Sequence, residues 1–239
     1  MKKQTVIVVY GRMNPPTKGH ESLIQKAVDI KKTGLPGNEP TKTKNWEKDS
    51  WHDKLSPKSK YFNDDTYVIF QESDELNLSD AKVVVMVTET YIGSGKKVSS
   101  ENKKRPVVRN PLKKENKVEL IEKMVDKRSV KVVTVPSLYS VFTEYPEEEY
   151  NVILVLGSDR VYGKERMKLV SKASAVVSVG RPETAYSSTQ LKTLIRNNKL
   201  KKARNMVSNR ILNNLFKKMT VKVIEGQEIH NEMRIKRKT

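Results

Sequence analysis

Continuous runs of apolar, β-branched residues alternate along this chain with amphipathic stretches. Such runs are expected where a strand is covered on both faces, as in a parallel sheet, and parallel strands need crossover connections that are usually helical. The sequence therefore predicts an α/β fold with five parallel strands, at 5–10, 81–89, 129–135, 150–157 and 174–180. Helical patterns lie between and after these runs, at about 18–31, 114–127, 137–144, 159–172, 188–197 and 199–218.

This order predicts a Rossmann-like, doubly wound parallel five-stranded sheet with helices on both faces, because the crossovers are right-handed. We expect residues 1–197 to form this domain, and residues 198–239 to form a basic, mainly helical C-terminal extension in which TVKVIE (220–225) is compatible with a strand. Residues 33–65 fit no strand-helix unit. They are rich in Pro, Gly, Asn and Lys, and we interpret them as an inserted loop or flap, since loops of this length are often functional.

Composition narrows the possible functions. The 239 residues contain 47 Lys and Arg against 28 Asp and Glu, a formal net charge of +19. Such an excess attracts nucleotides or nucleic acid, although a lysine-rich surface also simply favours solubility. With no cysteine and three histidines, the chain offers no disulfide scaffold, thiolate nucleophile or cysteine zinc site. We find no long apolar segment and no leader, so we expect a cytoplasmic protein without a membrane span.

The stretch GRMNPPTKGH (11–20) joins the first predicted strand to the first predicted helix. Ligands of open α/β sheets bind at this edge, and the unpaired amides at a helix N-terminus favour phosphate. His20 can donate a hydrogen bond to a phosphate oxygen, and Thr17 and Lys18 can flank the same anion. The stretch therefore predicts a phosphate-binding loop, and the alternative is a proline-rich turn that Thr17 caps.

GRMNPPTKGH resembles the (H/T)xGH signature, in a GRxNPxTxGH form, of the nucleotidyltransferase superfamily that includes nicotinamide-mononucleotide adenylyltransferases and cytidylyltransferases. YSSTQLK (186–192) is similar to that family's second signature, (I/S)SSTxxR, and also opens a predicted helix. LGSDRVYG (156–163) resembles the glycine-acidic stretch near the nucleotide. RNPLKKENKVELI (109–121) resembles the NPL…K segment of phage-encoded members, which suggests a bacteriophage protein. The resemblance covers about residues 4–197 without 33–65.

The resemblance implies a magnesium-dependent enzyme that transfers AMP or CMP from ATP or CTP to a phosphorylated acceptor and releases pyrophosphate, in a host cytoplasm if the protein is phage-encoded. It implies no protein metal site, because Mg²⁺ is held by the triphosphate. The implied catalytic residues are His20, Thr17 and Lys192. The implied nucleotide-binding residues are Gly11, Arg12, Asn14, Gly19, Gly157, Asp159, Ser187, Ser188 and Thr189. The base, the acceptor and the oligomeric state stay open.

Two positions depart from the family pattern. Lys192 replaces the final Arg of the second signature, which keeps the charge but loses a bidentate fork; Asn14 stands where the family often has Asp. Basic residues after the second predicted strand are candidate contacts for the acceptor or for nucleic acid: Lys96, Lys97, Lys103, Lys104, Arg105 and Arg109. The alternative function is therefore a viral protein that binds nucleic acid, such as RNA, and retains the fold with reduced or redirected catalysis.

Overall fold

The structure, a computed structural model, describes residues 2–35, 41–42, 66–69, 76–89, 110–158, 172–180, 186–197, 199–218, 221–222 and 228–229. The chain forms two compact units. The first comprises Met1–Gly11, Ser22–Thr88 and Lys127–Ala185, and the second comprises Arg12–Glu21, Glu89–Asp126 and Tyr186–Thr239.

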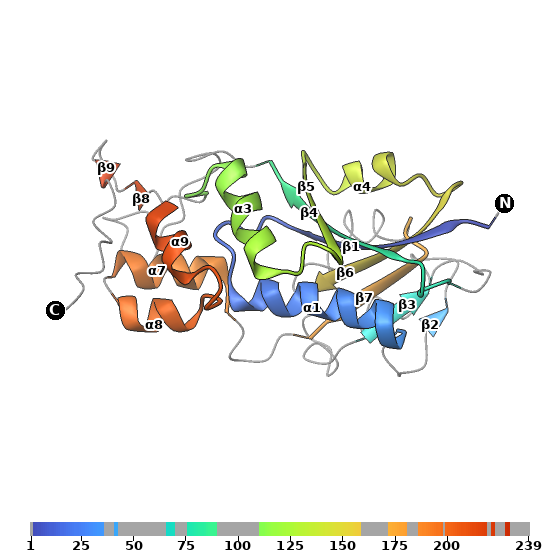
Figure 1. Cartoon of the computed structure of the whole chain (residues 1–239), viewed down its shortest axis with the longest axis horizontal. Helices are drawn as coiled ribbons and strands as arrows, with labels where there is room; N and C mark the ends of the chain where they lie inside the picture. The colour runs from blue at the N-terminus through green and yellow to red at the C-terminus, as the bar shows by residue number, and fades with distance from the viewer. Residues whose placement is uncertain are drawn as a thin grey trace. The chain divides into compact units, whose positions relative to one another are not determined.

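A parallel sheet organises the first unit (Figure 1). Its five parallel strands lie in the order β7-β6-β1-β4-β5, with β1 at the centre. This arrangement confirms the predicted Rossmann-like α/β fold and all five predicted strands to within a residue or two. Their bounds are β1 Gln4–Gly11, β4 Lys82–Thr88, β5 Val130–Val135, β6 Tyr150–Gly157 and β7 Ala175–Val179.

Two short strands that the sequence did not predict extend the sheet beyond β7. Strand β3 (Thr66–Ile69) pairs with β7 in the antiparallel direction, and β2 (Thr41–Lys42) pairs with β3 in parallel. Strand β2 lies within the segment that we interpreted as an inserted loop, so at these two residues that segment contributes to the sheet. At its start the proposed insertion overlaps the first helix, whose last residue is Thr33, and residues 36–40 and 43–65 lie outside the described residues.

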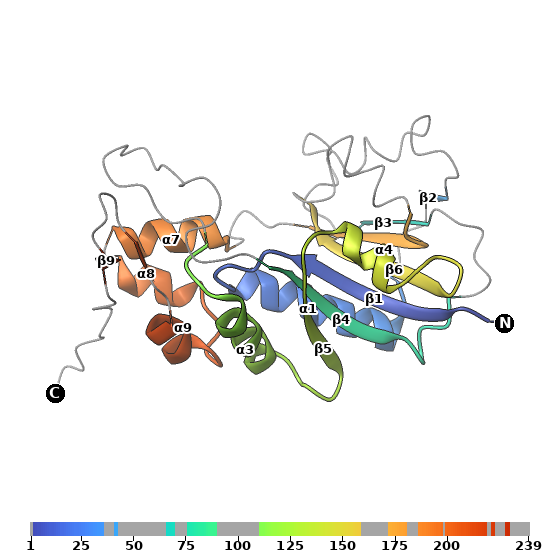
Figure 2. The same cartoon turned by 90° about the horizontal axis from the view of Figure 1, so that it is seen from above.

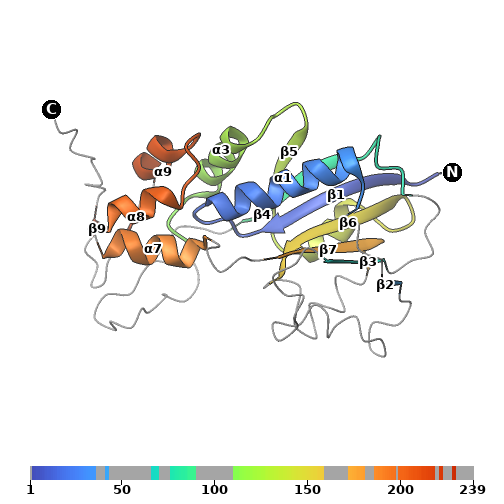
Figure 3. The same cartoon turned by 90° about the horizontal axis from the view of Figure 1, so that it is seen from below.

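Both faces of the sheet are buried, which explains the uninterrupted apolar runs. On one face, alternate residues such as Val6, Val84 and Leu154 pack with Val141 of helix α4 (Tyr139–Glu144). On the other face lies helix α1 (Lys18–Thr33), whose buried residues recur with helical spacing at Ile24, Ala27 and Ile30. Figure 2 shows α4 in front of the sheet, and Figure 3, from the opposite side, shows the part of α1 that belongs to this unit in front of it.

Helices dominate the second unit. They are α3 (Lys114–Met124), α7 (Ser188–Arg196), α8 (Leu200–Asn205) and α9 (Leu212–Lys218), and a two-stranded ribbon follows, of β8 (Val221–Lys222) and β9 (Glu228–Ile229). Their shared core includes Leu120, Leu191, Ala203 and Leu215. None of the described helices has the length and apolar character needed to cross a bilayer.

The prediction of one helix over 199–218 was wrong, because α8 ends at Asn205 and α9 begins at Leu212. The apolar pattern continues through the break, and Met206, Val207 and Ile211 are all buried, so periodicity alone could not reveal it. The hydroxyl of Ser208 accepts a hydrogen bond from the Arg210 amide at 3.3 Å and supports the turn. The helix predicted at 159–172 lies outside the described residues except for Lys172.

Candidate functional site

The two signature segments lie in direct contact within the second unit. The hydroxyl of Thr17 donates a hydrogen bond to the carbonyl oxygen of Tyr186 at 3.0 Å. A second hydrogen bond runs from the second segment to the first, in which the hydroxyl of Ser188 donates to the carbonyl oxygen of Pro15 at 2.7 Å. The structure therefore brings together the residues that the sequence predicted to share one phosphate, although about 170 positions separate them.

Gly19 makes this contact possible. A Cβ atom at position 19 would lie 2.8 Å from the carbonyl oxygen of Tyr186, and real Cβ atoms are not found so close to a backbone oxygen. Because the opposing atom belongs to the main chain, no side-chain rotation can relieve the overlap. The glycine of the first signature is thus explained by the close approach of the second.

His20 is oriented by the residue that precedes it by one helical turn. The amide of Thr17 donates to Nδ1 of His20 at 3.1 Å, and the Thr17 hydroxyl lies 2.9 Å from the same nitrogen. Because the amide can only donate, its bond to Nδ1 favours the neutral form of the imidazole that carries its proton on Nε2. The ring therefore presents Nε2 as a hydrogen-bond donor, which suits an anionic oxygen.

Helix α7 begins with a capping box. The Ser187 hydroxyl accepts from the Gln190 amide at 3.1 Å, and the Gln190 side chain accepts from the Ser187 amide at 3.2 Å. Neither bond involves the amides of Ser188 and Thr189 in the first turn. These two amides, at the positive end of a nine-residue helix, are suited to bind an anion.

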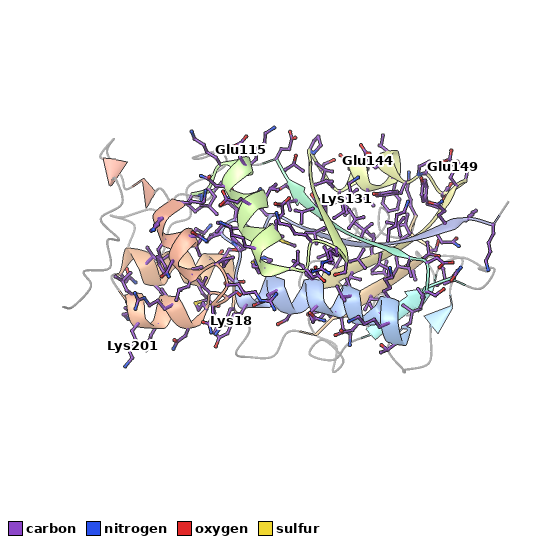
Figure 4. The ribbon with its side chains drawn as sticks, in the orientation of Figure 1. Lys18, Glu115, Lys131, Glu144, Glu149 and Lys201 are labelled. Atoms are coloured by element: carbon purple, nitrogen blue, oxygen red, sulfur yellow. The ribbon has the colours of Figure 1, made fainter. Side chains whose placement is uncertain are left out.

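The first turn of α1 contributes fewer amides. The backbone amide of Lys18 donates to the carbonyl oxygen of Met206 at 2.9 Å, and the amides of His20 and Glu21 donate to the carbonyl oxygen of Thr17. These three amides are therefore already engaged within the protein; the residue Lys18 is labelled in Figure 4. The Ser208 hydroxyl also donates to the carboxylate of Glu21 at 2.9 Å. The turn between α8 and α9, which we had assigned to a separate extension, therefore supports the first signature.

The side chain of Asn14 forms two hydrogen bonds with the backbone of Leu112. Its side-chain amide donates to the carbonyl oxygen of Leu112, and its side-chain carbonyl accepts from the Leu112 amide, both at 3.1 Å. The side chain is 1% exposed. An Asp could accept one of these bonds but could not donate the other, so the departure from the family pattern has a structural explanation.

Lys117 is a buried charged residue that the sequence analysis did not single out. It lies on α3, and the side chain is completely buried. Burial lowers its pKa from 10.5 to about 8; the positive charge of Arg12 contributes in the same direction, and Glu89 opposes both. Perturbed, buried ionisable groups are enriched at functional sites. One signal was present, because position 117 lies in line with Leu120 and Met124 on the apolar side of α3.

The remaining predicted residues fall into three groups. Gly11 and Gly157 end the adjacent strands β1 and β6, at the carboxyl edge of the sheet in the first unit. Lys192 lies on α7 in the second unit and is 5% exposed. Outside the described residues lie Asp159 and the basic candidates Lys96, Lys97, Lys103, Lys104, Arg105 and Arg109.

Across the described part of the chain, no three histidine, aspartate or glutamate side chains gather into a group that could hold a metal ion. No family model matches the chain, and no curated protein matches it.

Proposed function

We propose that the chain is a nucleotidyltransferase that transfers AMP or CMP from a nucleoside triphosphate to a phosphorylated acceptor. The observation that supports this proposal most directly is the contact between the two signature segments at Gly19, Thr17 and Tyr186. Two segments that resemble the phosphate-binding signatures of one family, and that meet in space, are difficult to explain as unrelated turns.

In the proposed reaction, an oxygen of the acceptor phosphate attacks the α-phosphorus of the triphosphate. The new P–O bond forms as the bond from the α-phosphorus to the bridging oxygen breaks, and pyrophosphate leaves with that electron pair. No protein nucleophile takes part, so the protein contributes alignment and stabilisation of the developing negative charge. Mg²⁺, carried by the triphosphate, would offset part of that charge.

Five described site residues have assigned roles in this proposal. The Nε2 proton of His20 donates to an oxygen on the α-phosphate, where charge increases during transfer. The amides of Ser188 and Thr189 bind the β- and γ-phosphates. Thr17 is completely buried, so we assign to it the orientation of His20 through its amide, in place of a direct contact with the triphosphate. Lys192 contributes positive charge from α7.

The test is a pyrophosphate-release assay with MgATP and MgCTP and a panel of phosphomonoester acceptors, together with calorimetric titration of each triphosphate. We expect His20→Ala to lower turnover by about 10²- to 10³-fold, which is typical for the loss of one donor to a charged transition state. His230→Ala, which removes a histidine outside both signatures, is the matched control. Wild-type protein that binds neither triphosphate at millimolar concentration would refute the proposal.

Nucleic-acid binding is a second candidate, and the net charge of +19 favours it. A protein that neutralises several phosphates loses affinity steeply as salt increases. We therefore expect gel shifts with RNA or DNA at low ionic strength that weaken with added salt. The absence of any shift at low ionic strength would reject this candidate and leave the transferase proposal unaffected.

A further inference from the structure

The helical segment 186–218 of the second unit carries basic residues without acidic ones. It contains nine Lys and Arg and no Asp or Glu. On α3, by contrast, charges of both signs occur and pair with lysines, since Glu119 forms ion pairs with Lys123 at 2.8 Å and with Lys218 of α9. Positive charge therefore exceeds negative charge along α7, α8 and α9.

The exposed positions of this segment are limited to three residue types. Each type donates hydrogen bonds, and all three are used by proteins to contact phosphate and sugar oxygens. From 197 to 217, every described residue that is exposed is Asn, Lys or Arg: Asn197, Lys199, Lys201, Lys202, Asn205, Asn209, Arg210, Asn213 and Lys217.

Apolar side chains are missing from this surface. Among the described residues, the large hydrophobic side chain that is exposed is Tyr139, which belongs to the first unit. A helix that binds a membrane inserts apolar side chains into the lipid interface, in addition to presenting cations to the headgroups. The surface of α8 therefore suits a phosphodiester backbone better than a membrane.

Helix α8 concentrates the positive charge over a short distance. Its inner side is marked by Ala203, which is completely buried in the core that it shares with Leu191 of α7. Lys201 and Lys202 are both exposed, and the exposed Lys199 directly precedes the helix. At about 1.5 Å per residue, their backbone positions lie within one Debye length of about 8 Å at physiological salt. The three charges therefore act together on one polyanion. Figure 4 labels Lys201 at the outer edge of α8.

Local helix stability does not account for these lysines. The start of a helix favours acidic residues, whereas α8 has Lys199 at its N-cap, without a side-chain capping bond, and no acidic residue in its first turn. Lys201 and Arg204 are neighbours at i, i+3 spacing, where like charges repel. Within the part of the chain that the structure describes, Lys199, Lys201 and Lys202 form no ion pair. A bound anion would offset this repulsion.

We propose that the surface of α8 that carries Lys199, Lys201 and Lys202, the basic face, binds the phosphodiester backbone of a nucleic-acid strand. The proposal deepens the second candidate function and rests on it, whereas it does not depend on transferase activity. A lysine ammonium is a point charge that contacts phosphate oxygens and carries no information about the base. The basic face therefore binds strands of different sequence with similar affinity.

The experiment is fluorescence anisotropy of the full-length protein with labelled single strands of about 16 nucleotides, one RNA and one DNA of the same base order, over a series of salt concentrations. For a single strand, each neutralised phosphate contributes about 0.7 to the slope of log affinity against log salt. Lys201→Gln/Lys202→Gln should therefore reduce the slope by about 1.4 and weaken binding by about tenfold at low salt.

Two further variants separate the basic face from the charge of the whole protein. Lys201→Arg/Lys202→Arg keeps both charges and should bind as wild type does. Lys32→Gln/Lys131→Gln removes two exposed lysines of the first unit, so it changes the net charge equally and should keep the wild-type slope. Circular dichroism of each variant checks its folding, and if Lys201→Gln/Lys202→Gln does not fold, Lys201→Gln alone should reduce the slope by about 0.7.

The outcomes distinguish the basic face from the candidate function on which it rests. If the Gln variant of α8 keeps the wild-type slope, or if the control loses as much of it, the basic face is refuted and nucleic-acid binding stands. If wild-type protein binds neither strand at low ionic strength, both are refuted. Losses in α8 should be equal for RNA and DNA, and a loss with one strand alone would refute backbone binding. Binding to vesicles that contain phosphatidylserine, without binding to either strand, would assign the face to a membrane and also refute the proposal.

Discussion

Replacing Gly19 with Ala tests the close approach of the two signature segments. The new Cβ would lie 2.8 Å from the carbonyl oxygen of Tyr186, about 0.6 Å inside an ordinary van der Waals contact of about 3.4 Å. Overpacking of this kind typically costs about 1–3 kcal/mol. Part of this cost is offset, because Ala favours a helix over Gly by up to about 1 kcal/mol in the interior and by less in the first turn. We therefore expect Gly19→Ala to reduce the free energy of unfolding by about 1–2 kcal/mol.

Urea unfolding measures this change, as a lower midpoint with an unchanged slope. Ser22→Ala is the matched control, because Ser22 is exposed on the same helix and its replacement should alter stability by no more than about 0.5 kcal/mol. The clash also displaces Thr17 from Tyr186, so triphosphate affinity should decrease in Gly19→Ala and not in the control. If Gly19→Ala were as stable as wild type or more so, the segments could not approach as closely as the structure indicates.

Asn14→Asp should reduce the free energy of unfolding by about 2–4 kcal/mol at neutral pH, because a buried carboxylate would face the Leu112 carbonyl oxygen. The loss should be smaller near pH 4, where a protonated Asp can donate a hydrogen bond to that oxygen. An equal loss at both pH values would contradict this account. Ser187→Ala should reduce the free energy of unfolding by about 1 kcal/mol, as measured by urea unfolding. Ser187→Thr keeps the capping hydroxyl and should be nearly as stable as wild type; equal losses in the two variants would show that this hydroxyl is not responsible. The pKa of Glu119 is lowered to about 2 by hydrogen bonds from Lys123 and Lys218. The ionised Glu119 therefore stabilises the folded protein fully above about pH 4.5, which is its pKa in the unfolded chain, and this stabilisation is lost as the pH falls through about 2. The stabilities of wild type and Glu119→Gln should then converge as the pH approaches 2, and a constant difference would argue against these hydrogen bonds.

The fold could be predicted because a strand that is buried on both faces needs a continuous run of apolar residues, and such runs stand out even in a lysine-rich chain. In β1, successive residues are buried on opposite faces, as at Ile7 and Val8, and β5 at one edge of the sheet keeps its valines although Lys131 is exposed. Strand β2 lies at the other edge and has only two residues, too few to show a pattern. Strand β3 carries a short apolar run, TYVI, but only four residues stand in strand conformation, so the run was shorter than those that predicted the other strands.

The site could be predicted only in part, because a motif specifies residue types and not their partners. The resemblance implied that Thr17 and His20 lie near Ser188, and the described hydrogen bonds show these segments in contact. It did not imply the burial of Lys117. In a lysine-rich chain, one more lysine after Lys113 and Lys114 is expected to be solvated, and its alignment with Leu120 and Met124 was too weak a signal to outweigh that expectation.

The described contacts divide the signature residues by what their side chains already do. Thr17, Asn14 and Ser188 use side-chain groups to fasten one segment to another, whereas the groups that we assign to the ligand are the amides of Ser188 and Thr189 and the Nε2 side of the His20 ring. A side-chain donor that already has a partner gains less from a phosphate, because the existing bond must first be broken. Substitutions of Thr17, Asn14 and Ser188 should therefore lower stability and activity together. His20→Ala should lower turnover by far more than it lowers stability, where the loss of the hydrogen bond from the Thr17 amide costs about 1 kcal/mol.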